Sequence, residues 1–229
     1  MASNQQWIEL AGPALFPAGC FLAVQRYDAP EILLPEVEDA SLGRATEKRQ
    51  REFSAGRVAA RAALRRLGIA ETLLPVGTNR SPRWPGGVVG SITHTAGLAV
   101  AVVARQENIT GLGLDLELNA AVKQELWRGI LTARELAWIS GQPRDRQEPL
   151  ATLIFSAKES FYKLQYPLTG RWVDFLEADI TFLPEAGEFQ LTCTQSEATM
   201  KLQQSRFHGR FAISTEFTLT AMHLAGAAQ

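Results

Sequence analysis

The sequence has few of the residues that build disulfide frameworks or zinc sites. Its 229 residues include two cysteines, Cys20 and Cys193, and three histidines. Neither cysteine has another cysteine or a histidine nearby at metal-ligand spacing, which argues against both kinds of site. Two isolated thiols suit a reducing compartment. The opening residues, MASNQQW, also lack the basic start and apolar core of a signal peptide, so we expect a cytoplasmic protein.

Net charge and long apolar runs are lacking as well. The 23 lysines and arginines nearly balance the 24 aspartates and glutamates, for a formal net charge of -1. Such a chain has no global positive field of the kind that attracts nucleic acid. The apolar run at residues 98–104 is far too short to cross a bilayer. We expect a monomer without nucleic-acid or membrane partners, in which any anion site is local.

What the chain does have is enough apolar material, 46% of its residues, for one large core or two small ones. It also contains an internal echo: FSAGRVAARAAL at residues 53–64 is similar to FSAKESFYKLQY at residues 155–166, and strands are predicted after each. The echo predicts an α+β fold of two pseudo-symmetric halves, each a helix with an antiparallel sheet. We place the halves at residues 1–112 and 113–229, with the site between them, where ligand pockets often lie.

The first half contains a predicted helix at residues 46–67, which Gly68 ends. Arg57, Arg61 and Arg65 recur on it at intervals of four residues. Like charges at that spacing destabilise a helix, and an anion bound between them would remove the cost. The alternative is a solvated basic face balanced by carboxylates elsewhere.

A hairpin-like arrangement follows this helix. Residues 88–92 and 98–104 read as strands, and residues 93–97 between them read as the turn, which overlaps the end of the segment GSITH at residues 90–94. His94 lies at this turn, three residues after Ser91. Binding residues concentrate at turns, so His94 is a candidate donor to a phosphate. The alternative is a structural histidine beside apolar strands.

The segment GLGLDLE at residues 111–117 has a strict alternation. In a strand, the three leucines would share one face, while Asp115 and Glu117 would project from the other face above two glycines. Neighbouring carboxylates on one strand face are unfavourable unless a cation or solvent separates them. Hard oxygen ligands suit magnesium. The alternative is simply an acidic end of a surface strand.

The second half contains the segment FSAKESFYK at residues 155–163. We expect a loop at residues 140–149 and then a helix from Leu150 to about Tyr166, ended by Pro167. On that helix Glu159 and Lys163 are one turn apart and share a polar face. The simplest interpretation is a solvated ion pair; the alternative is that both side chains belong to a site.

Taken together, these segments resemble the phosphopantetheinyl transferase family, its larger Sfp-type class, and most closely the branch of enterobactin synthetase component D. Five motifs in order are far more specific than any one of them. They are KRQxEFxxGRxxAR at residues 48–61, RSPxWP at 80–85, GSITH at 90–94, GLGLDLE at 111–117 and FSAKESFYK at 155–163.

The resemblance implies transfer of the phosphopantetheine arm of coenzyme A to a serine of an acyl or peptidyl carrier protein. Adenosine 3′,5′-bisphosphate would be released, with magnesium as the cofactor. The sequence leaves open which carrier is served, including one for siderophore biosynthesis. A noncatalytic module that binds coenzyme A or a carrier protein on the same fold is the alternative.

The resemblance also implies roles for individual residues. The expected magnesium ligands are Asp115, Glu117 and Glu159. Glu159 and Lys163 are the expected catalytic residues, and the base that deprotonates the serine is Lys163, Glu159 or a metal-bound water. The expected contacts to the phosphates of coenzyme A are Arg49, Arg57, Arg80, Ser91, His94 and Lys163.

Overall fold

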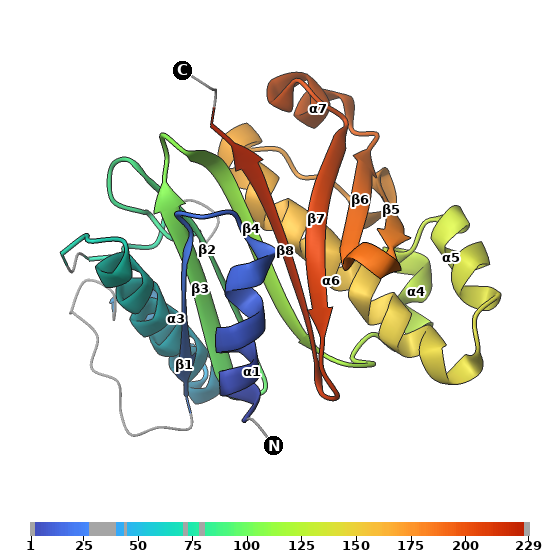
Figure 1. The fold of residues 1–229 in the computed structure, drawn as a ribbon, viewed down its shortest axis with the longest axis horizontal. Coiled ribbons are helices and arrows are strands. Elements are labelled where there is room, and N and C mark those ends of the chain that lie inside the picture. Colours follow the sequence, from blue (N-terminus) through green and yellow to red (C-terminus); the bar gives the residue numbers. More distant parts are fainter. Residues whose placement is uncertain (1–2, 28–39, 44, 71–72, 78–80, 227–229) are drawn as a thin grey trace.

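Two antiparallel sheets lie side by side in the computed structural model (Figure 1), which describes residues 3–27, 40–43, 45–70, 73–77 and 81–226. The small sheet has the strand order β1-β3-β2 and the large sheet the order β4-β8-β7-β6-β5. This architecture confirms the predicted α+β class with two antiparallel sheets. The strands are β1 (Phe21–Arg26), β2 (Val88–Thr95), β3 (Leu98–Arg105), β4 (Ile109–Leu118), β5 (Ala178–Leu183), β6 (Glu188–Cys193), β7 (Arg206–Ile213) and β8 (Phe217–Ala225).

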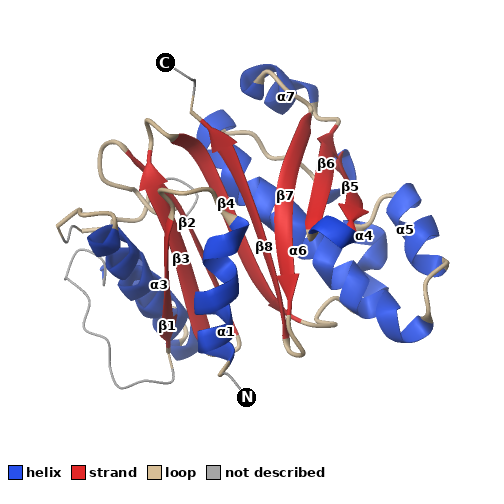
Figure 2. Cartoon of the chain, in the orientation of Figure 1, coloured by secondary structure: helices blue, strands red, loops and turns tan. Residues whose placement is uncertain are grey.

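Each sheet is covered by one long helix (Figure 2). Helix α3 packs on the small sheet and helix α6 on the large one. The shorter helices lie at the N-terminus of the chain and beside the large sheet. The α-helices are α1 (Asn4–Ala11), α3 (Glu47–Arg66), α4 (Trp127–Ile130), α5 (Ala133–Ser140), α6 (Arg144–Thr169) and α7 (Ser196–Leu202).

Helix α3 has the bounds that its sequence predicts. The side chain of Thr46 accepts a hydrogen bond from the backbone nitrogen of Arg49 at 3.3 Å, which caps the start. Leu67 caps the other end, directly before Gly68. The face toward the sheet carries three buried alanines, Ala59, Ala60 and Ala63, and their small side chains let the helix lie close to β1 and β3. Local signals were sufficient for this element.

Helix α6 is longer than predicted at both ends. It begins at Arg144 inside the expected loop, continues through Pro149 and Pro167, and ends at Gly170, whose φ of 64° is left-handed. Each proline inside a helix removes one hydrogen bond and costs about 3 kcal/mol. The buried face of α6 extends along the helix from Ala151 to Thr169, so packing against the large sheet offsets that cost.

The turn predicted at residues 93–97 is correct only for residues 96 and 97, and its first three residues are wrong. Residues 90–94 belong to strand β2, whose pairing with β3 continues to Thr95 opposite Leu98. The turn is the pair Ala96 and Gly97, both with positive φ (46° and 83°). Because two residues suffice to reverse an antiparallel chain, His94 stays within the ladder.

Side-chain hydroxyls connect the two sheets along the seam where β2 lies beside β4 (Figure 1). The hydroxyl of Ser91 accepts from the backbone nitrogen of Leu114 at 3.1 Å, and that of Thr93 accepts from Leu116 at 3.2 Å. Strand β4 begins at Ile109, so the predicted boundary between residues 112 and 113 falls inside it. The division into those two halves stays a prediction.

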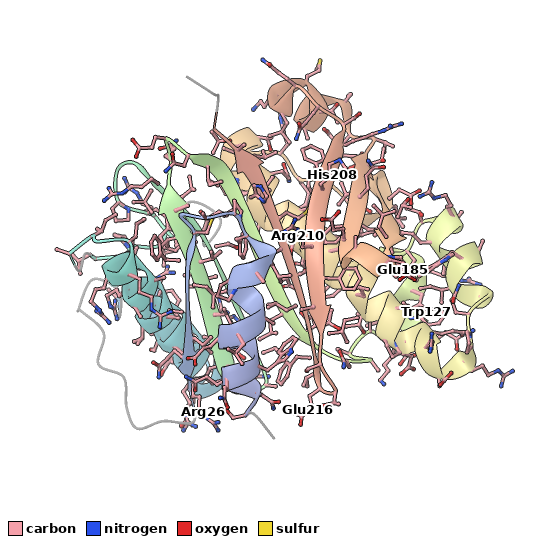
Figure 3. The ribbon with its side chains drawn as sticks, viewed as in Figure 1. Arg26, Trp127, Glu185, His208, Arg210 and Glu216 are labelled. Atoms are coloured by element: carbon pink, nitrogen blue, oxygen red, sulfur yellow. The ribbon has the colours of Figure 1, made fainter. Side chains whose placement is uncertain are left out.

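The N-terminal segment spans both sheets. Helix α1 contacts β1, and the following 3-10 turn, Gly12–Leu15, contacts β7 and β8. On β7, Arg210 (labelled in Figure 3) donates to the carbonyl oxygen of Ala14 at 3.4 Å. A core of buried residues from both sheets lies under this segment. Within the described ranges, no helix has the length and apolar character needed to span a bilayer.

Candidate active site

Asp115 and Lys163 meet where helix α6 crosses strand β4. The ammonium Nζ of Lys163 donates to Asp115 Oδ1 at 2.5 Å and to the hydroxyl of Thr93 at 3.3 Å. The Thr93 hydroxyl in turn donates to Asp115 Oδ1 at 3.1 Å. Asp115 is 2% exposed, and its second oxygen, Oδ2, is buried without a hydrogen-bond partner. A buried carboxylate oxygen in that position is suited to a cation.

The leucines of β4 have the predicted orientation. Leu112, Leu114 and Leu116 are buried in the core shared by the two sheets. Gly111 and Gly113 face helix α6 instead, so close that a β-carbon on Gly113 would lie 1.9 Å from the carbonyl oxygen of Ser160. The alternation in GLGLDLE therefore separates the core face from the face that carries the acidic residues.

Glu117 and Glu159 lie in the same electrostatic environment as Asp115. Burial, with the charge of Asp115, raises the pKa of Glu117 to about 8. Burial also raises the pKa of Glu159, with a further contribution from Asp115, while Lys163 opposes the rise. Both glutamates thus resist ionisation mainly because they are buried, with the charge of Asp115 adding to the effect, and a bound cation would favour their ionised forms.

The three carboxyl groups do not form a ready-made metal cage. Among the residues that the structure describes, no three His, Cys, Asp or Glu side chains are arranged to hold an ion. Lys163 instead supplies the positive charge beside Asp115. Burial lowers the pKa of Lys163, but Asp115 and Glu159 raise it more, so the net direction is upward. The donors, all carboxylate oxygens with one of them unpartnered, nevertheless fit magnesium by type.

Arg49 and His94 meet at the start of helix α3, although 45 residues separate them in the sequence. Nη1 of Arg49 lies 3.0 Å from Nε2 of His94. Burial lowers the pKa of His94, as do the positive charges of Arg49 and Lys163, while the negative charges of Glu52 and Asp115 oppose the fall. Glu52, which the sequence analysis did not single out, lies 3.8 Å from both groups. It stands inside the KRQREF segment, so the signal for it was present in the motif.

The other arginines of helix α3 and the other predicted phosphate contacts differ in how deeply they are buried. Arg57 and Arg61 are each 4% exposed, so the solvated-face interpretation is wrong for them, whereas Arg65 is exposed. The guanidinium of Arg57 lies 4.5 Å from the ring centre of Phe53. Ser91 is buried and bonded to Leu114, and it also lines a cavity. Arg80 lies outside the described residues.

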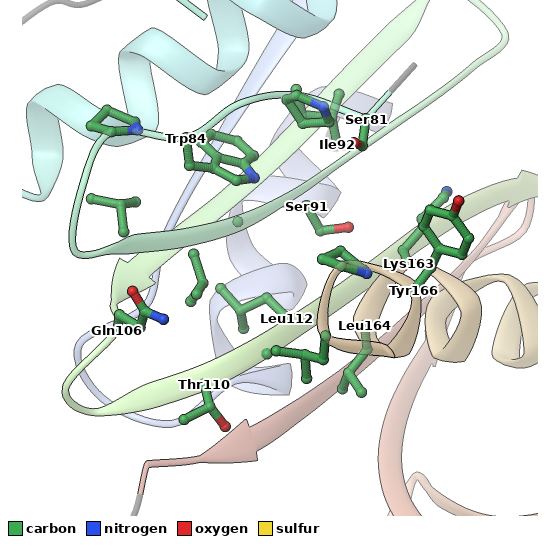
Figure 4. Close-up of a pocket in the computed structure, with 18 of the residues that line it drawn as sticks. Ser81, Trp84, Ser91, Ile92, Gln106, Thr110, Leu112, Lys163, Leu164 and Tyr166 are labelled. Carbon is green, nitrogen blue, oxygen red and sulfur yellow. The ribbon is translucent and has the colours of Figure 1, made fainter. Parts of the chain in front are cut away.

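The cavity has a volume of about 540 Å³ and lies along the seam between β2 and β4 (Figure 4). Lys163 and Tyr166 lie at one side of it in Figure 4, Ser91 lies near its middle, and Gln106 and Thr110 lie at the opposite side. Most of the rest of its wall is apolar. Gln106, Thr110, Tyr162 and Tyr166 were not predicted from the sequence: Tyr162 stands inside FSAKESFYK without a predicted role, and the other three lie outside the five motifs.

Residues 81–87 cover this cavity. Trp84 lines it and lies so close to β2 that a β-carbon on Gly90 would come within 2.6 Å of the indole ring. Gly90 is therefore required for the close approach of the tryptophan. Residues of the motifs RSPRWP and GSITH thus form part of the same wall of the cavity.

Lys158, beside Glu159 in the FSAKESFYK segment, has a structural environment. Its ammonium donates to Glu135 at 2.7 Å and to the carbonyl oxygens of Ile130 and Phe175 at 2.7 and 2.8 Å. Glu135 completes a capping box with Thr132 and also accepts from the backbone nitrogen of Ile180 at 2.7 Å. Because both side chains are buried and fully engaged, this pair holds α4, α5 and β5 to helix α6.

Comparisons with known proteins agree with the motifs. Residues 37–104 match the family model of the 4'-phosphopantetheinyl transferase N-terminal domain, and residues 111–216 match the 4'-phosphopantetheinyl transferase superfamily. The chain is 37% identical over 221 residues to 4'-phosphopantetheinyl transferase Svp of Streptomyces mobaraensis, which covers 94% of this chain and 89% of that protein.

Two further relatives extend this result. The chain is 34% identical over 218 residues to 4'-phosphopantetheinyl transferase Npt of Nocardia iowensis, or 91% of this chain and 97% of that protein. It is 41% identical to enterobactin synthase component D of Salmonella typhi over 124 residues, about half of each chain (52% and 49%). From the shared motifs, the two-sheet fold and these matches, the chain belongs to the 4'-phosphopantetheinyl transferase superfamily.

Proposed function

We propose that the chain transfers the phosphopantetheine moiety of coenzyme A to a serine of an acyl or peptidyl carrier protein, with magnesium as its cofactor. The observation that carries the proposal is the junction of Asp115 and Lys163, with Glu117 and Glu159 in the same electrostatic environment, beside a mostly apolar cavity that Lys163 lines. A ligand with an anionic end and a long thin arm matches that combination.

Asp115, Glu117 and Glu159 would hold the magnesium ion. When bound, the ion would neutralise charge on the pyrophosphate of coenzyme A. The unpartnered Oδ2 of Asp115 and the raised pKa values of both glutamates support this role. Since cation binding favours the ionised carboxyl form, the three groups would lose their mutual repulsion.

Lys163 serves in the proposal as the cation that contacts the phosphate, and Glu159 as the base. The raised pKa of Lys163 keeps its ammonium protonated, which opposes a role as proton acceptor. Glu159, ionised when magnesium is bound, is a carboxylate that can accept a proton. The serine oxygen bonds to the phosphorus that carries the pantetheine arm as the bond from that phosphorus to the bridging oxygen breaks. Glu159 takes the hydroxyl proton, and adenosine 3′,5′-bisphosphate leaves.

The other phosphate contacts would come from Arg49 and His94, which the fold brings together, with Arg57, Arg80 and Ser91 as further candidates. The cavity would take the pantetheine arm along its apolar wall. The partner is expected to be an acidic helical carrier domain, and the enzyme a cytoplasmic monomer. Attraction between unlike charges weakens with salt, so the apparent carrier affinity should fall as ionic strength rises.

The test is a mass-spectrometric assay for phosphopantetheine on an apo-carrier protein incubated with the chain, coenzyme A and magnesium. We expect Asp115→Ala and Glu159→Ala each to lower the transfer rate roughly 100-fold or more. Glu125→Ala, which removes an exposed carboxylate, is the control and should retain the rate. Coenzyme A binding without any transfer would favour the noncatalytic module instead, and full activity in both variants would refute the metal assignment.

A further inference from the structure

Glu52 is a largely buried carboxylate among cations on helix α3. Its side chain is 13% exposed, and Oε2 lies 3.8 Å from Nη1 of Arg49 and 3.8 Å from Nδ1 of His94. Its other oxygen lies 3.9 Å from Nζ of Lys48. Glu52 therefore contacts both members of the Arg49 and His94 pair across the junction of α3 with β2.

The contact between Arg49 and His94 decides which ring nitrogen of the histidine carries the proton. A guanidinium only donates hydrogen bonds, so Nε2 of His94, 3.0 Å from Arg49 Nη1, must accept. In the neutral ring the proton is then on Nδ1, the nitrogen that faces Glu52. Glu52 thus favours the tautomer in which the ring and the guanidinium can lie together.

A carboxylate at this position is not explained by attraction to a phosphate. Its negative charge repels any anion that Arg49 and His94 would bind, so by charge alone Glu52 weakens such a site. The guanidinium of Arg49 and the Nδ1 proton of the neutral His94 ring, however, both face the Glu52 carboxylate, which attracts each of them. Holding the pair in one arrangement is the role that accounts for the contacts on both sides of Glu52.

We infer that Glu52 is a positioning residue that holds Arg49 and His94 as a joint binding pair for a phosphate of coenzyme A. This inference rests on the proposed function for the identity of the ligand. It assigns no contact between Glu52 and the substrate, and its effect is transmitted through the two neighbouring side chains.

The direction in which the KM for coenzyme A changes when the Glu52 carboxylate is removed distinguishes a positioning role from a purely electrostatic one. Glu52→Met removes the carboxylate at similar size. If Glu52 positions the pair, the KM for coenzyme A rises about fivefold or more, with kcat and the carrier KM nearly unchanged. If Glu52 is only a neighbouring negative charge, the KM for coenzyme A falls or stays the same, and the inference is overturned.

Glu47→Met is the matched control, because Glu47 is an exposed carboxylate on the same helix that pairs with Arg51 and has no contact with Arg49 or His94. Its KM for coenzyme A should stay within about twofold of the original. Glu52→Asp, which keeps the charge on a shorter side chain, should restore part of the loss. A double variant, Glu52→Met with Arg49→Met, should have the KM of Arg49→Met alone, and additive effects would contradict action through Arg49.

Two measurements do not require turnover. Calorimetric titration with coenzyme A measures the affinity directly, so the inference can be tested even where no holo-carrier forms and the proposed function fails. Nitrogen-15 NMR reports the His94 tautomer: the proton should be on Nδ1 in the original chain and redistribute toward Nε2 in Glu52→Met. An unchanged tautomer together with an unchanged affinity would refute the role.

Discussion

The backbone of Gly113 on β4 contacts the backbone of Ser160 on α6. The space between them holds the α-hydrogen of glycine but not a β-carbon. A β-carbon on Gly113 would lie 1.9 Å from the carbonyl oxygen of Ser160. Asp115 follows Gly113 by two residues on the same strand face, and Glu159 immediately precedes Ser160. Glycine at position 113 thus allows strand β4 and helix α6, which carry the candidate site, to lie this close together.

Gly113→Ala should separate these elements. Because the contact is with the backbone of Ser160, either β4 or α6 must move, and overpacking of this kind costs about 3 kcal/mol of unfolding free energy. We also expect the transfer rate to fall at least about tenfold, since small misplacements of catalytic groups are costly. Urea unfolding and the carrier assay measure the two effects.

The control for this change is Gly129→Ala in helix α4, where a β-carbon would meet nothing within 4 Å. Alanine at such a helical position should leave stability unchanged or raise it by less than about 1 kcal/mol. If the two variants behave alike, the close approach of β4 and α6 does not determine the site.

Glu117 should make stability depend on pH and magnesium together. Its pKa is about 8 in the folded chain against an ordinary value of 4.5, so between these values the folded state keeps a proton that the unfolded state has lost. The stability contributed by this group is therefore complete below the lower value, falls as pH rises through the window, and levels off above about 8. Glu117→Gln should remove that slope in thermal unfolding.

Magnesium favours the ionised carboxyl, so it competes with this proton. The rise in Tm on adding magnesium should be larger at about pH 9 than at about pH 6. Glu117→Gln should reduce the rise at the higher pH. A magnesium effect that is independent of pH in the original chain would contradict a role for Glu117 at the ion.

Lys158→Met should destabilise the fold strongly. It leaves Glu135 buried and charged without its partner at 2.7 Å, and loss of one member of a buried pair costs about 3–5 kcal/mol. Adding Glu135→Leu should recover part of the loss. The matched control is Lys123→Met, which breaks an exposed pair with Glu148 at the same distance of 2.7 Å and should cost less than about 1 kcal/mol. Equal losses of unfolding free energy, measured in urea, would show that burial of the Lys158 and Glu135 pair does not increase its contribution to stability.

Leu168→Trp should obstruct the cavity. Leu168 lines it close to Gly111, where its Cδ1 would be 3.1 Å from an added β-carbon. A larger ring there should raise the KM for coenzyme A roughly tenfold while the carrier KM stays unchanged. Leu183→Trp is the control, since Leu183 is similarly exposed at the end of β5 and does not line the cavity. An unaffected KM for coenzyme A would mean that the arm binds elsewhere.

Local patterns were enough for much of this protein. The cap at Thr46 and the stop at Gly68 define helix α3, and the alternation in GLGLDLE separates its core leucines from its carboxylates. These features depend on backbone geometry and on neighbours within one or two turns. The five motifs in their order were sufficient to identify the family for the same reason. Each motif is a short segment whose residue types indicate its chemistry.

Packing between distant segments decided the rest. It extended α6 through two prolines, because burial of the helix face outweighs two lost hydrogen bonds. It placed Lys158 in a buried pair but Lys163 on Asp115, although both belong to one short motif. It also brought Glu52 to His94 and opened the cavity along the seam. Such contacts join residues tens of positions apart, and spacing along the chain does not encode the distance between them.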